Sequence, residues 1–422
     1  MIDTSCLRRK ILDSLLNPES LKKSCSSKEN KLGDVLKIER GGSPRPIKSY
    51  LTTSDDGMNW IKIGDTKPGS KYIEAVKEKI KPEGLKKSRF VREGDFLLSN
   101  SMSFGRPYIL KVDGCIHDGW LVLKDRNSIF DKNFLYYYLS SPRLYAEFAI
   151  KAGGSTVENL NIDLVSSVDI IIPPLEEQKR IVAKIEELFA KIDEIDKAQK
   201  ELKELAELAE KKVLDMAVRG ELVEQDASEG TAADILNQIR EDYKTRKTNK
   251  WQKTSLSHKI GSFNIPASWQ WTSIEEIVDG IIIGKDKPKD CSEIRTKDKQ
   301  IPVVANGIQN DGIVGYTSMS SLSTGKVVTV AGRGSIGYPI VRNYPFYPIV
   351  RLIVLKPNRN IDCDYLSLVL FCLREEGSGT AINQLTAPMI REKQIPLPPL
   401  LEQKRISNIY NRFKSFKTRL TD

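Results

Sequence analysis

The sequence carries, at Ile172-Pro173-Pro174-Leu175-Glu176-Glu177-Gln178-Lys179-Arg180-Ile181, a segment that returns 225 positions later as Leu397-Pro398-Pro399-Leu400-Leu401-Glu402-Gln403-Lys404-Arg405-Ile406. The likeness continues upstream, where Asp131 and Phe134-Leu135 correspond to Asp362 and Tyr365-Leu366 at a spacing of 231. A repeat of this length spans a whole domain rather than a single motif. The chain is therefore a tandem duplication.

The repeated framework is interrupted by segments that differ between the copies. Ser103-Phe104-Gly105 parallels Ser335-Ile336-Gly337, and we expect the glycines Gly105 and Gly337 to serve a turn. Between Gly41 and Arg92, however, the first copy has almost nothing in common with residues 281–323 of the second. This pattern indicates one scaffold that carries two different recognition surfaces.

The composition predicts a protein of several domains, because 422 residues exceed the size at which one core stops growing. The sequence contains no apolar run of about 18 residues and does not begin with a signal-peptide pattern, so we expect a cytoplasmic protein that does not enter a membrane. Its six cysteines form no Cys-x-x-Cys pair and it has only two histidines, so we expect no zinc or other structural metal.

The net charge of +10 is unevenly distributed along the chain. Residues 173–222 hold 10 Lys and Arg against 13 Asp and Glu, which leaves 56 basic and 43 acidic residues elsewhere. A basic surplus of this size in the flanking domains indicates a polyanionic partner, and nucleic acid is favoured over a membrane surface because no amphipathic basic helix is evident. Duplex DNA also offers two similar halves to a duplicated protein.

A long helix is predicted to follow the first Pro-Pro pair. Proline presets the first turn, Glu176 and Glu177 suit the positive end of the helix dipole, and Gly220 is a natural stop. Apolar residues recur in steps of three and four, which is coiled-coil spacing. The helix from Pro174 to Arg219 has 46 residues, or about 69 Å, and we expect it to act as a spacer.

The flanking domains have the pattern of mixed α+β units. Short runs rich in β-branched and aromatic residues predict strands at Trp60–Ile63, Phe96–Leu98, Trp120–Leu123, Lys326–Val330 and Val350–Leu355. Each domain then has one predicted helix, Lys132–Ala149 or Asp362–Arg374, and a strand, Val168–Ile172 or Lys393–Leu397, that leads into the Pro-Pro pair. Within the polar connector after the long helix, a further helix is predicted at Ala232–Tyr243.

Taken together, these residues resemble the DNA specificity subunit of a type I restriction-modification system. The Pro-Pro-Leu-x-Glu-Gln-x-x-Ile pattern that opens each long helix is a marker of that family, and both copies carry it. Residues 212–226 also resemble the close of the family's central conserved region, and Pro266 to Trp271 resembles the entry to its second recognition domain. The match covers nearly the full chain.

The resemblance implies an α+β fold in which two similar target-recognition domains are joined by long helices that form an antiparallel coiled coil, with a pseudo-twofold internal repeat. The predicted boundaries are an N-terminal helical segment (1–28), a first recognition domain (29–172), a central helix (173–222), a linker with a short helix (223–267), a second recognition domain (268–397) and a short distal helix (398–422). The coiled-coil and partner positions that we predict are Pro174, Gln178, Ile181, Ile185, Leu188, Ile192, Ile195, Leu202, Pro399, Gln403 and Ile406.

The resemblance also implies that this chain performs no chemistry. It would bind double-stranded DNA at a split, asymmetric site and direct two methyltransferase subunits and nuclease-translocase subunits, whose cofactors would be S-adenosylmethionine, ATP and magnesium, while this chain would bind none. The sequence has no phosphate-binding Gly-x-x-x-x-Gly-Lys-Ser/Thr loop and no Asn/Asp-Pro-Pro-aromatic motif. Asn343 to Phe346 lacks the adjacent prolines, and His117 lacks a Ser or Cys partner, so we expect structural roles there or, for His117, a DNA contact.

Candidate DNA contacts are basic and small polar residues in predicted loops, because arginine reads guanine and lysine neutralises phosphate. In the first domain they are Arg45, Lys48, Lys86, Lys87, Arg89, Ser101, Ser103 and Arg106, and in the second they are Lys285, Lys287, Lys289, Arg333 and Ser335. For any single lysine, a merely solvated charge is the competing interpretation.

The second long helix is shorter than the first, with 25 residues from Pro398 to Asp422. The segment Arg9-Lys10-Ile11-Leu12-Asp13 resembles Lys211-Lys212-Val213-Leu214-Asp215. We therefore expect the start of the chain to supply the piece missing from its end, with residues 6–16 beside the tail of the central helix in a circular architecture.

Two other classes of function stay open on the sequence alone. A free-standing DNA-binding regulator would share the basic domains and the long helices, but it would bind specific DNA without a methyltransferase partner. A structural coiled-coil scaffold would account for the helices but not for the basic surplus or the duplicated domains.

Overall fold

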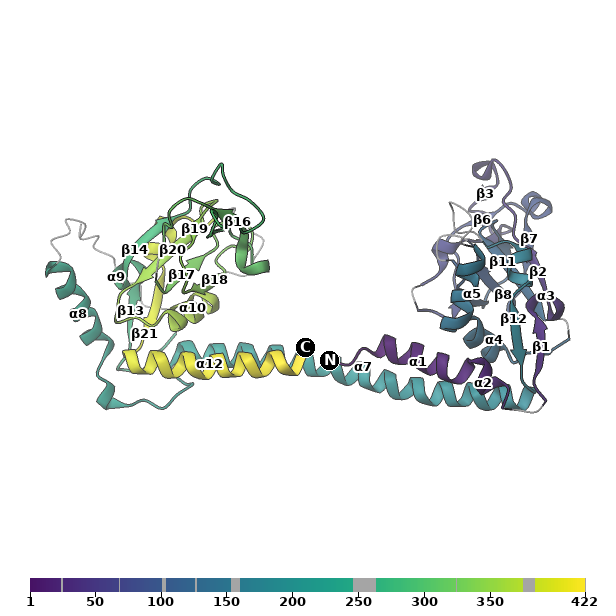
Figure 1. Ribbon diagram of the computed structural model, residues 1–422, viewed down its shortest axis with the longest axis horizontal. Helices are drawn as coiled ribbons and strands as arrows, with labels where there is room; N and C mark the ends of the chain where they lie inside the picture. The colour runs from purple at the N-terminus through teal and green to yellow at the C-terminus, as the bar shows by residue number, and fades with distance from the viewer. Residues whose placement is uncertain are drawn as a thin grey trace. The chain divides into compact units, whose positions relative to one another are not determined.

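The computed structural model describes residues 1–23, 26–67, 69–100, 104–125, 127–152, 160–245, 263–323, 325–374 and 384–421. The chain divides into two compact units, Met1–Lys200 and Glu201–Asp422. Each unit holds one mixed α+β domain, and helix α7 (Leu175–Arg219) contributes residues to both (Figure 1). The fold class expected from the sequence is confirmed.

The first unit begins with a helix and then alternates short strands with helical turns. Its helices are α1 (Thr4–Leu16), α2 (Pro18–Leu21), α3 (Leu32–Val35), α4 (Lys132–Leu139), α5 (Pro142–Ala152) and α6 (Ile162–Ser166), with 3-10 turns η1 (Ile47–Ser49), η2 (Ile63–Asp65) and η3 (Pro82–Lys87). Its strands are β1 (Lys28–Lys31), β2 (Leu36–Arg40), β3 (Leu51–Thr52), β4 (Met58–Ile61), β5 (Tyr72–Ile73), β6 (Lys79–Ile80), β7 (Arg89–Val91), β8 (Phe96–Ser99), β9 (Pro107–Leu110), β10 (Gly114–Ile116), β11 (Trp120–Asp125) and β12 (Asp169–Ile172).

The second unit repeats this plan, with fewer strands among its described residues. Its helices are α8 (Ala232–Thr245), α9 (Ile274–Ile277), α10 (Cys363–Cys372), α11 (Ala387–Glu392) and α12 (Leu400–Thr421), with 3-10 turns η4 (Ala227–Glu229) and η5 (Gln309–Gly312). Its strands are β13 (Gln270–Ser273), β14 (Val278–Ile283), β15 (Ile301–Val304), β16 (Ile313–Thr317), β17 (Val327–Val330), β18 (Pro339–Arg342), β19 (Tyr347–Pro348), β20 (Ile353–Pro357) and β21 (Gln394–Leu397).

Sheet order shows which strands of the two units are equivalent. The order β2-β11-β8-β9 in the first unit matches β14-β20-β17-β18 in the second, and the antiparallel pair β1-β12 matches β13-β21. Strand registers agree, because Leu121 pairs with both Arg40 and Leu98, as Ile353 pairs with both Ile283 and Val330. The internal repeat predicted from the sequence is therefore a repeat of structure.

Each unit builds its main core between this sheet and its helices. In the first unit, Phe134 and Leu139 of α4 and Phe148 of α5 are fully buried with Leu98 and Leu121 of the sheet. In the second unit, the largest core contains residues of α8, α10, the sheet and the tail of α7. The connector helix α8 is thus part of a core, with Ala232, Leu236 and Ile239 buried, rather than a free linker element.

Two predicted elements differ from the structure in more than the position of their end residues. The helix expected at Lys132–Ala149 is two helices, α4 and α5, because Pro142 lacks the N–H that a continuous helix requires. The strand expected at Val350–Leu355 starts only at Ile353, because Val350 and Arg351 adopt positive φ angles of 53° and 59°.

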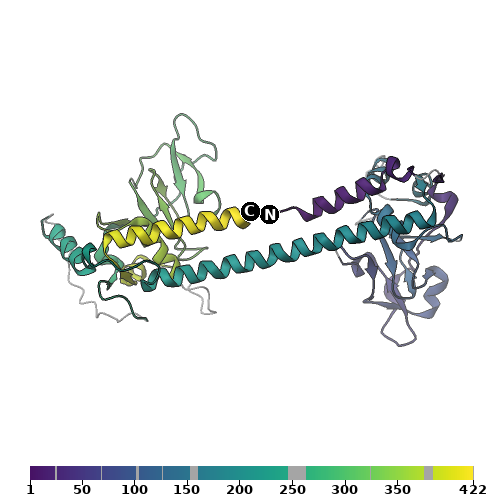
Figure 2. The same cartoon turned by 90° about the horizontal axis from the view of Figure 1, so that it is seen from below.

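The central helix has the predicted bounds within one residue. It runs for 45 residues and stops at Gly220, whose φ of 75° lets the Glu221 N–H donate back to Met216 O at 2.9 Å. In the first unit its early part lies beside α1, and in the second unit its tail lies beside α12 (Figures 1 and 2). Both neighbours run antiparallel to α7. Ile2 and Arg8 meet Gln199 and Asp193 of α7 in reversed order. In α12, Tyr410 and Lys417 bond to Glu210 of α7, whereas the earlier Glu402 accepts from Gln225, which follows the end of α7.

The expected position of the N-terminal helix needs a correction. Helix α1 lies beside Phe189 to Asp196 of α7, not beside residues 211–216, because Leu12 and Leu16 fill the core of the first unit. Its sequence counterparts in the α7 tail, Leu214 and Val218, are buried in the core of the second unit. Helix α1 therefore does in the first unit what the α7 tail does in the second, as the predicted circular repeat requires.

No helix among the described residues is long and apolar enough to cross a membrane. In the same residues, no group of three or more His, Cys, Asp and Glu side chains has an arrangement that would hold a metal ion.

Candidate nucleic-acid interface

One of the predicted contact residues of the first unit, Arg45, lies beside the turn between β10 and β11, residues His117 to Gly119. The loop that follows β2 lies against this turn: Gly42 N–H donates to Ile116 O at 3.1 Å, and a Cβ on Gly41 would lie 2.1 Å from His117 O. Only glycine permits this approach. The loop then reaches Arg45, whose guanidinium is 3.6 Å from Asp118 and 80% exposed.

Asp118 anchors this loop through its carboxylate. Ser43 Oγ donates to Asp118 Oδ1 at 2.6 Å, and this hydrogen bond is the main reason that the pKa of Asp118 lies below its usual value. The charged Asp118 therefore holds Ser43 and attracts Arg45. Asp118 could not be found from the sequence, because its role depends on contacts with Ser43 and Arg45 that only the fold creates.

His117 has a structural role in this turn. Its ring is half-buried, and the Ile63 N–H donates to Nε2 at 3.2 Å. Burial lowers the pKa of His117, so the ring is neutral at physiological pH. These contacts fit the structural role, one of the two roles expected for His117 from the sequence.

The other predicted residues of the first domain differ in whether their side chains are already bonded within the fold. Lys48 lies on η1, and Lys86 and Lys87 end η3, where Lys87 Nζ donates to Tyr50 Oη at 2.8 Å. Arg89 is committed within the fold, because it donates to Arg40 O at 2.9 Å and pairs with Glu39 at 3.1 Å. Arg106 is exposed at the end of its loop, whereas Ser101 and Ser103 fall outside the described residues.

The second unit has an equivalent turn at residues Ile349 to Arg351. We call these two turns, His117 to Gly119 and Ile349 to Arg351, together with the loops that pack on them, the junctions of the two domains. A Cβ on Gly284 would lie 2.7 Å from Ile349 O, so Gly284 packs against this turn as Gly41 packs against His117. Lys285 follows directly, and its backbone receives the Val350 N–H at 2.9 Å. The loop after β17 brings Arg333, whose Nη2 donates to Gln384 Oε1 at 3.1 Å.

The remaining predictions in the second unit lie further along these loops. Lys287 and Lys289 are exposed after Lys285, and Ser335 is half-buried in the turn that closes at Gly337. Gly105 and Gly337 both have positive φ, at 66° and 76°, which confirms that they serve turns. Arg351 was missed, because the sequence placed it inside a strand.

Exposed basic side chains lie in the loops at and beside both turns. Exposed Arg45 and Lys48 in the first unit, and exposed Lys285, Arg333 and Arg351 in the second, project from glycine-supported loops. The segment Asn343 to Phe346, which lacks the adjacent prolines of the Asn/Asp-Pro-Pro-aromatic motif, is part of the fold. Tyr344 Oη receives a 2.7 Å hydrogen bond from buried Arg342, and Phe346 is fully buried.

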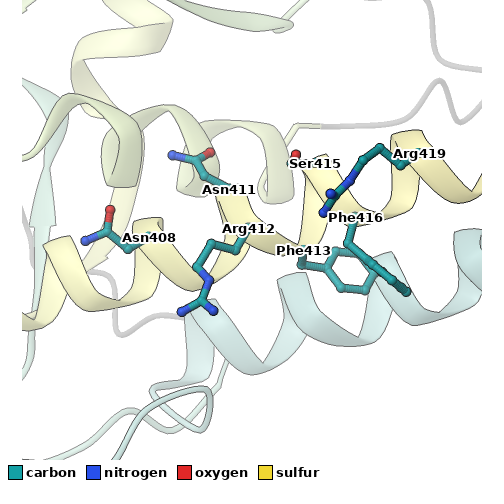
Figure 3. Close-up of a pocket in the computed structure, with 7 residues that line it drawn as sticks. All are labelled: Asn408, Asn411, Arg412, Phe413, Ser415, Phe416 and Arg419. Atoms are coloured by element: carbon teal, nitrogen blue, oxygen red, sulfur yellow. The ribbon is translucent and has the colours of Figure 1, made fainter.

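The predicted coiled-coil positions lie mostly inside the units. Gln178, Ile185, Ile192, Pro399, Gln403 and Ile406 are buried, Ile181, Leu188, Ile195 and Leu202 are half-buried, and Pro174 is exposed. Other apolar residues of the helices face outward: Leu205 and Leu208 on α7, and Ile409, Phe416 and Leu420 on α12. A pocket along α12 lies beside Asn408, Arg412, Phe413 and Phe416 (Figure 3).

Comparisons with known proteins find similar sequences and a similar fold. Residues 26–207 and 266–422 match the family described as type I restriction modification DNA specificity domain. A putative type I specificity subunit of Mycoplasma pneumoniae is 27% identical over 172 residues, 41% of this chain, and the match spans 47% of that relative, or about half its length. A second putative specificity subunit of the same organism is 26% identical over 390 residues, 89% of this chain and 86% of the relative.

The fold is also similar to a solved structure, described as the structural basis of complex assembly and conformational transition of the type I R-M system. The TM-score is 0.70 at 20% identity, and the match covers 96% of this chain and 93% of the other.

Proposed function

Because this chain belongs to the type I restriction-modification DNA specificity family, we propose that it reads a split, asymmetric DNA site with one half assigned to each recognition domain. The observation that carries the proposal is the pair of equivalent junctions with different side chains. The first presents His117-Asp118-Gly119 and the second presents Ile349-Val350-Arg351 at the same place in the sheet. Two scaffolds of one design with different surfaces would read different bases, so the site would not be a palindrome.

The long helix would set the distance between the two half-sites. Helix α7 is continuous through 45 residues, and its ends are fixed in the two units by buried apolar side chains. A continuous helix changes its length only in steps of about 1.5 Å per residue. The spacer between the half-sites would therefore follow the length of α7.

Catalysis would belong to partner subunits, and this chain would take no step in it. The proposed complex contains two DNA adenine methyltransferase subunits, and nuclease-translocase subunits in a restricting form. S-adenosylmethionine, ATP and magnesium would be bound by those partners. Such a complex would act on DNA in the cytoplasm.

The outward apolar face of α12 would receive a partner helix. Ile409, Phe416 and Leu420 recur at intervals of seven and four, so they share one flank of the helix, and Phe416 is 54% exposed. Exposed apolar residues at helical spacing mark helix-in-groove or coiled-coil contacts. We assign this flank to a helical segment of the methyltransferase subunit.

The test is to co-express the chain with the methyltransferase subunit encoded beside it and to map N6-methyladenine in the host DNA by single-molecule sequencing. A bipartite, asymmetric motif is the expected result. If the two proteins co-purify without producing a motif, the split-site proposal fails. If they do not associate and this chain alone binds specific DNA, the function is that of a free-standing regulator.

A further inference from the structure

The two recognition domains hold one equivalent turn in place by different means. Strand register places Gly119 and Arg351 two residues before the equivalent residues Leu121 and Ile353. Asp118 is therefore equivalent to Val350. In both domains the backbone carbonyl of this residue accepts a hydrogen bond from the side-chain amide of an asparagine.

In the first domain this asparagine comes from the end of β8. Asn100 is fully buried, and its Nδ2 donates to Asp118 O at 2.9 Å. Its own backbone is tied on both sides, because the Asn100 N–H donates to Gly119 O at 3.0 Å and the Leu160 N–H donates to Asn100 O at 2.9 Å. The amide thus joins the β8 loop to the turn.

In the second domain the position equivalent to Asn100 is Gly332, since the Leu385 N–H donates to Gly332 O at 2.9 Å as Leu160 does to Asn100. A Cβ on Gly332 would lie 2.7 Å from Arg351 O, so this domain has no room for an asparagine there. Asn306, which follows β15, replaces it. Its Nδ2 donates to Val350 O at 2.7 Å, and its Oδ1 accepts the Gly332 N–H at 2.8 Å.

The turn that Asn306 holds is strained. Val350 and Arg351 have φ angles of 53° and 59°, a region that is unfavourable for a β-branched residue and uncommon for arginine. Strained residues persist only where surrounding contacts fix them, and they concentrate at ligand-binding positions. Here the fixing contacts are the Asn306 bond and the hydrogen bonds from the Val350 and Arg351 N–H groups to Lys285 O and Gly284 O, at 2.9 and 3.2 Å.

The strain brings a basic side chain to the surface among other basic residues. Arg351 is exposed, and its backbone is directly bonded to the segment that carries Lys285. Asn306 connects the same turn to Gly332, which precedes exposed Arg333. An ordinary strand start would place residue 351 in the sheet and would not need this arrangement.

We propose that Arg351 is a specificity-determining DNA contact of the second recognition domain and that Asn306 is its positioning residue. The proposal rests on the proposed function, because it assumes that this domain reads one half of a split site. Arginine donates two parallel hydrogen bonds to the guanine edge, and lysine cannot reproduce that geometry. Arg351 would read one guanine of the second half-site.

The test uses the full chain in complex with its methyltransferase subunit and reads the motif from N6-methyladenine sequencing. Arg351→Ala is expected to relax one position of the second half-site, with discrimination there falling by roughly 5- to 150-fold, while the first half-site stays unchanged. Arg351→Lys is expected to keep overall methylation closer to wild type but to relax the same position. Lys356→Ala, which removes an exposed charge from β20, the strand that follows Arg351, is the matched control and should leave the motif intact.

Other outcomes overturn the assignment. An unchanged motif in Arg351→Ala means that Arg351 does not read DNA, and a uniform loss at all sites means a phosphate contact without specificity. If the wild-type complex itself produces no bipartite motif, the proposed function fails rather than this inference.

Asn306 is tested by two substitutions that separate its two hydrogen bonds. Asn306→Asp keeps an acceptor for the Gly332 N–H but loses the donor to Val350 O, and Asn306→Ala loses both. Both variants are expected to blur the second half-site and to spare the first. A lower unfolding midpoint with a wild-type motif would show a purely structural role and would overturn the positioning assignment.

Discussion

Asp131 and Gln178 lie 47 positions apart and are joined by a hydrogen bond of 2.8 Å from the Asp131 N–H to Gln178 Oε1. The same bond joins Asp362 to Gln403 at 2.8 Å. Gln178 Nε2 also donates to Ile129 O and Pro173 O, at 2.9 and 3.0 Å. The glutamine of the repeated motif therefore fastens the long helix to the start of α4 or α10, which explains why it recurs at the first turn of both helices.

Replacing this glutamine should loosen the joint. Gln178 is fully buried, so Gln178→Ala would leave the Asp131 N–H and two carbonyl groups without their partner. Each unsatisfied buried group costs about 1–3 kcal/mol, and we expect the free energy of unfolding of the first unit to fall by roughly 2–4 kcal/mol. Denaturant-induced unfolding measures this change.

The matched control is Glu176→Ala, because Glu176 is two residues away and its side chain is 83% exposed. This variant should stay within about 0.5 kcal/mol of wild type. Equal stability of Gln178→Ala and Glu176→Ala would show that the hydrogen bonds of Gln178 do not stabilise the joint.

Local sequence patterns predicted the parts of the fold that depend on local order. The Pro-Pro start, the apolar spacing and Gly220 mark α7 within one residue, and the duplicated motif reveals the two units. The turn at Val350 and Arg351 was predicted as a strand, because its shape is imposed by Asn306, 44 positions away. Likewise, Arg89 resembles a free basic residue in sequence, yet strand pairing places it beside Glu39.

Glu402 should make stability depend on pH. It is 1% exposed, accepts a 2.5 Å hydrogen bond from Gln225, and its burial raises the pKa of the carboxyl above the ordinary value of 4.5. An acid whose pKa is higher in the folded state favours folding when protonated, and this contribution is lost as the pH rises through the folded pKa. At neutral pH the buried carboxylate is therefore a cost.

Glu402→Gln removes that cost because the amide is uncharged. The introduced amide oxygen still accepts the hydrogen bond from Gln225. We expect the variant to unfold at a higher denaturant concentration than wild type at pH 7, and the difference to shrink as the pH falls toward 4.5. Glu177→Gln is the control from the first repeat, where the carboxylate is 35% exposed and paired with Arg180 at 2.8 Å. An equal difference in unfolding midpoint between Glu402→Gln and wild type at both pH values would contradict the burial of the carboxylate as the cause of that difference.

The length of α7 should set the DNA spacer. The hydrogen bond of Ile2 reaches α7 at Gln199, and those of Tyr410 and Lys417 of α12 reach it at Glu210, so an insertion after Lys200 falls between these contacts. Seven helix-forming residues add about 10.5 Å. They preserve the facing of the helix to within about 20°.

The expected result is a methylation motif with both half-sites unchanged and a spacer longer by about three base pairs at 3.4 Å each. A five-residue insertion turns the following helix by about 140° and should abolish methylation, although the protein still folds. A seven-residue variant that keeps the wild-type spacer would show that α7 does not set the distance.

The outward flank of α12 gives the last prediction, which concerns assembly. Phe416→Glu puts a charge on an apolar side chain that is 54% exposed, so the isolated chain should keep its unfolding midpoint while association with the methyltransferase subunit weakens by tenfold or more. Co-purification and titration by light scattering or calorimetry measure this loss. Ile150→Glu is the control, because Ile150 is 79% exposed on α5 of the first unit. If both variants bind the methyltransferase subunit as tightly as the wild-type chain does, this flank is not part of the partner interface. If both lose affinity to the same extent, the loss is a general effect of added negative charge.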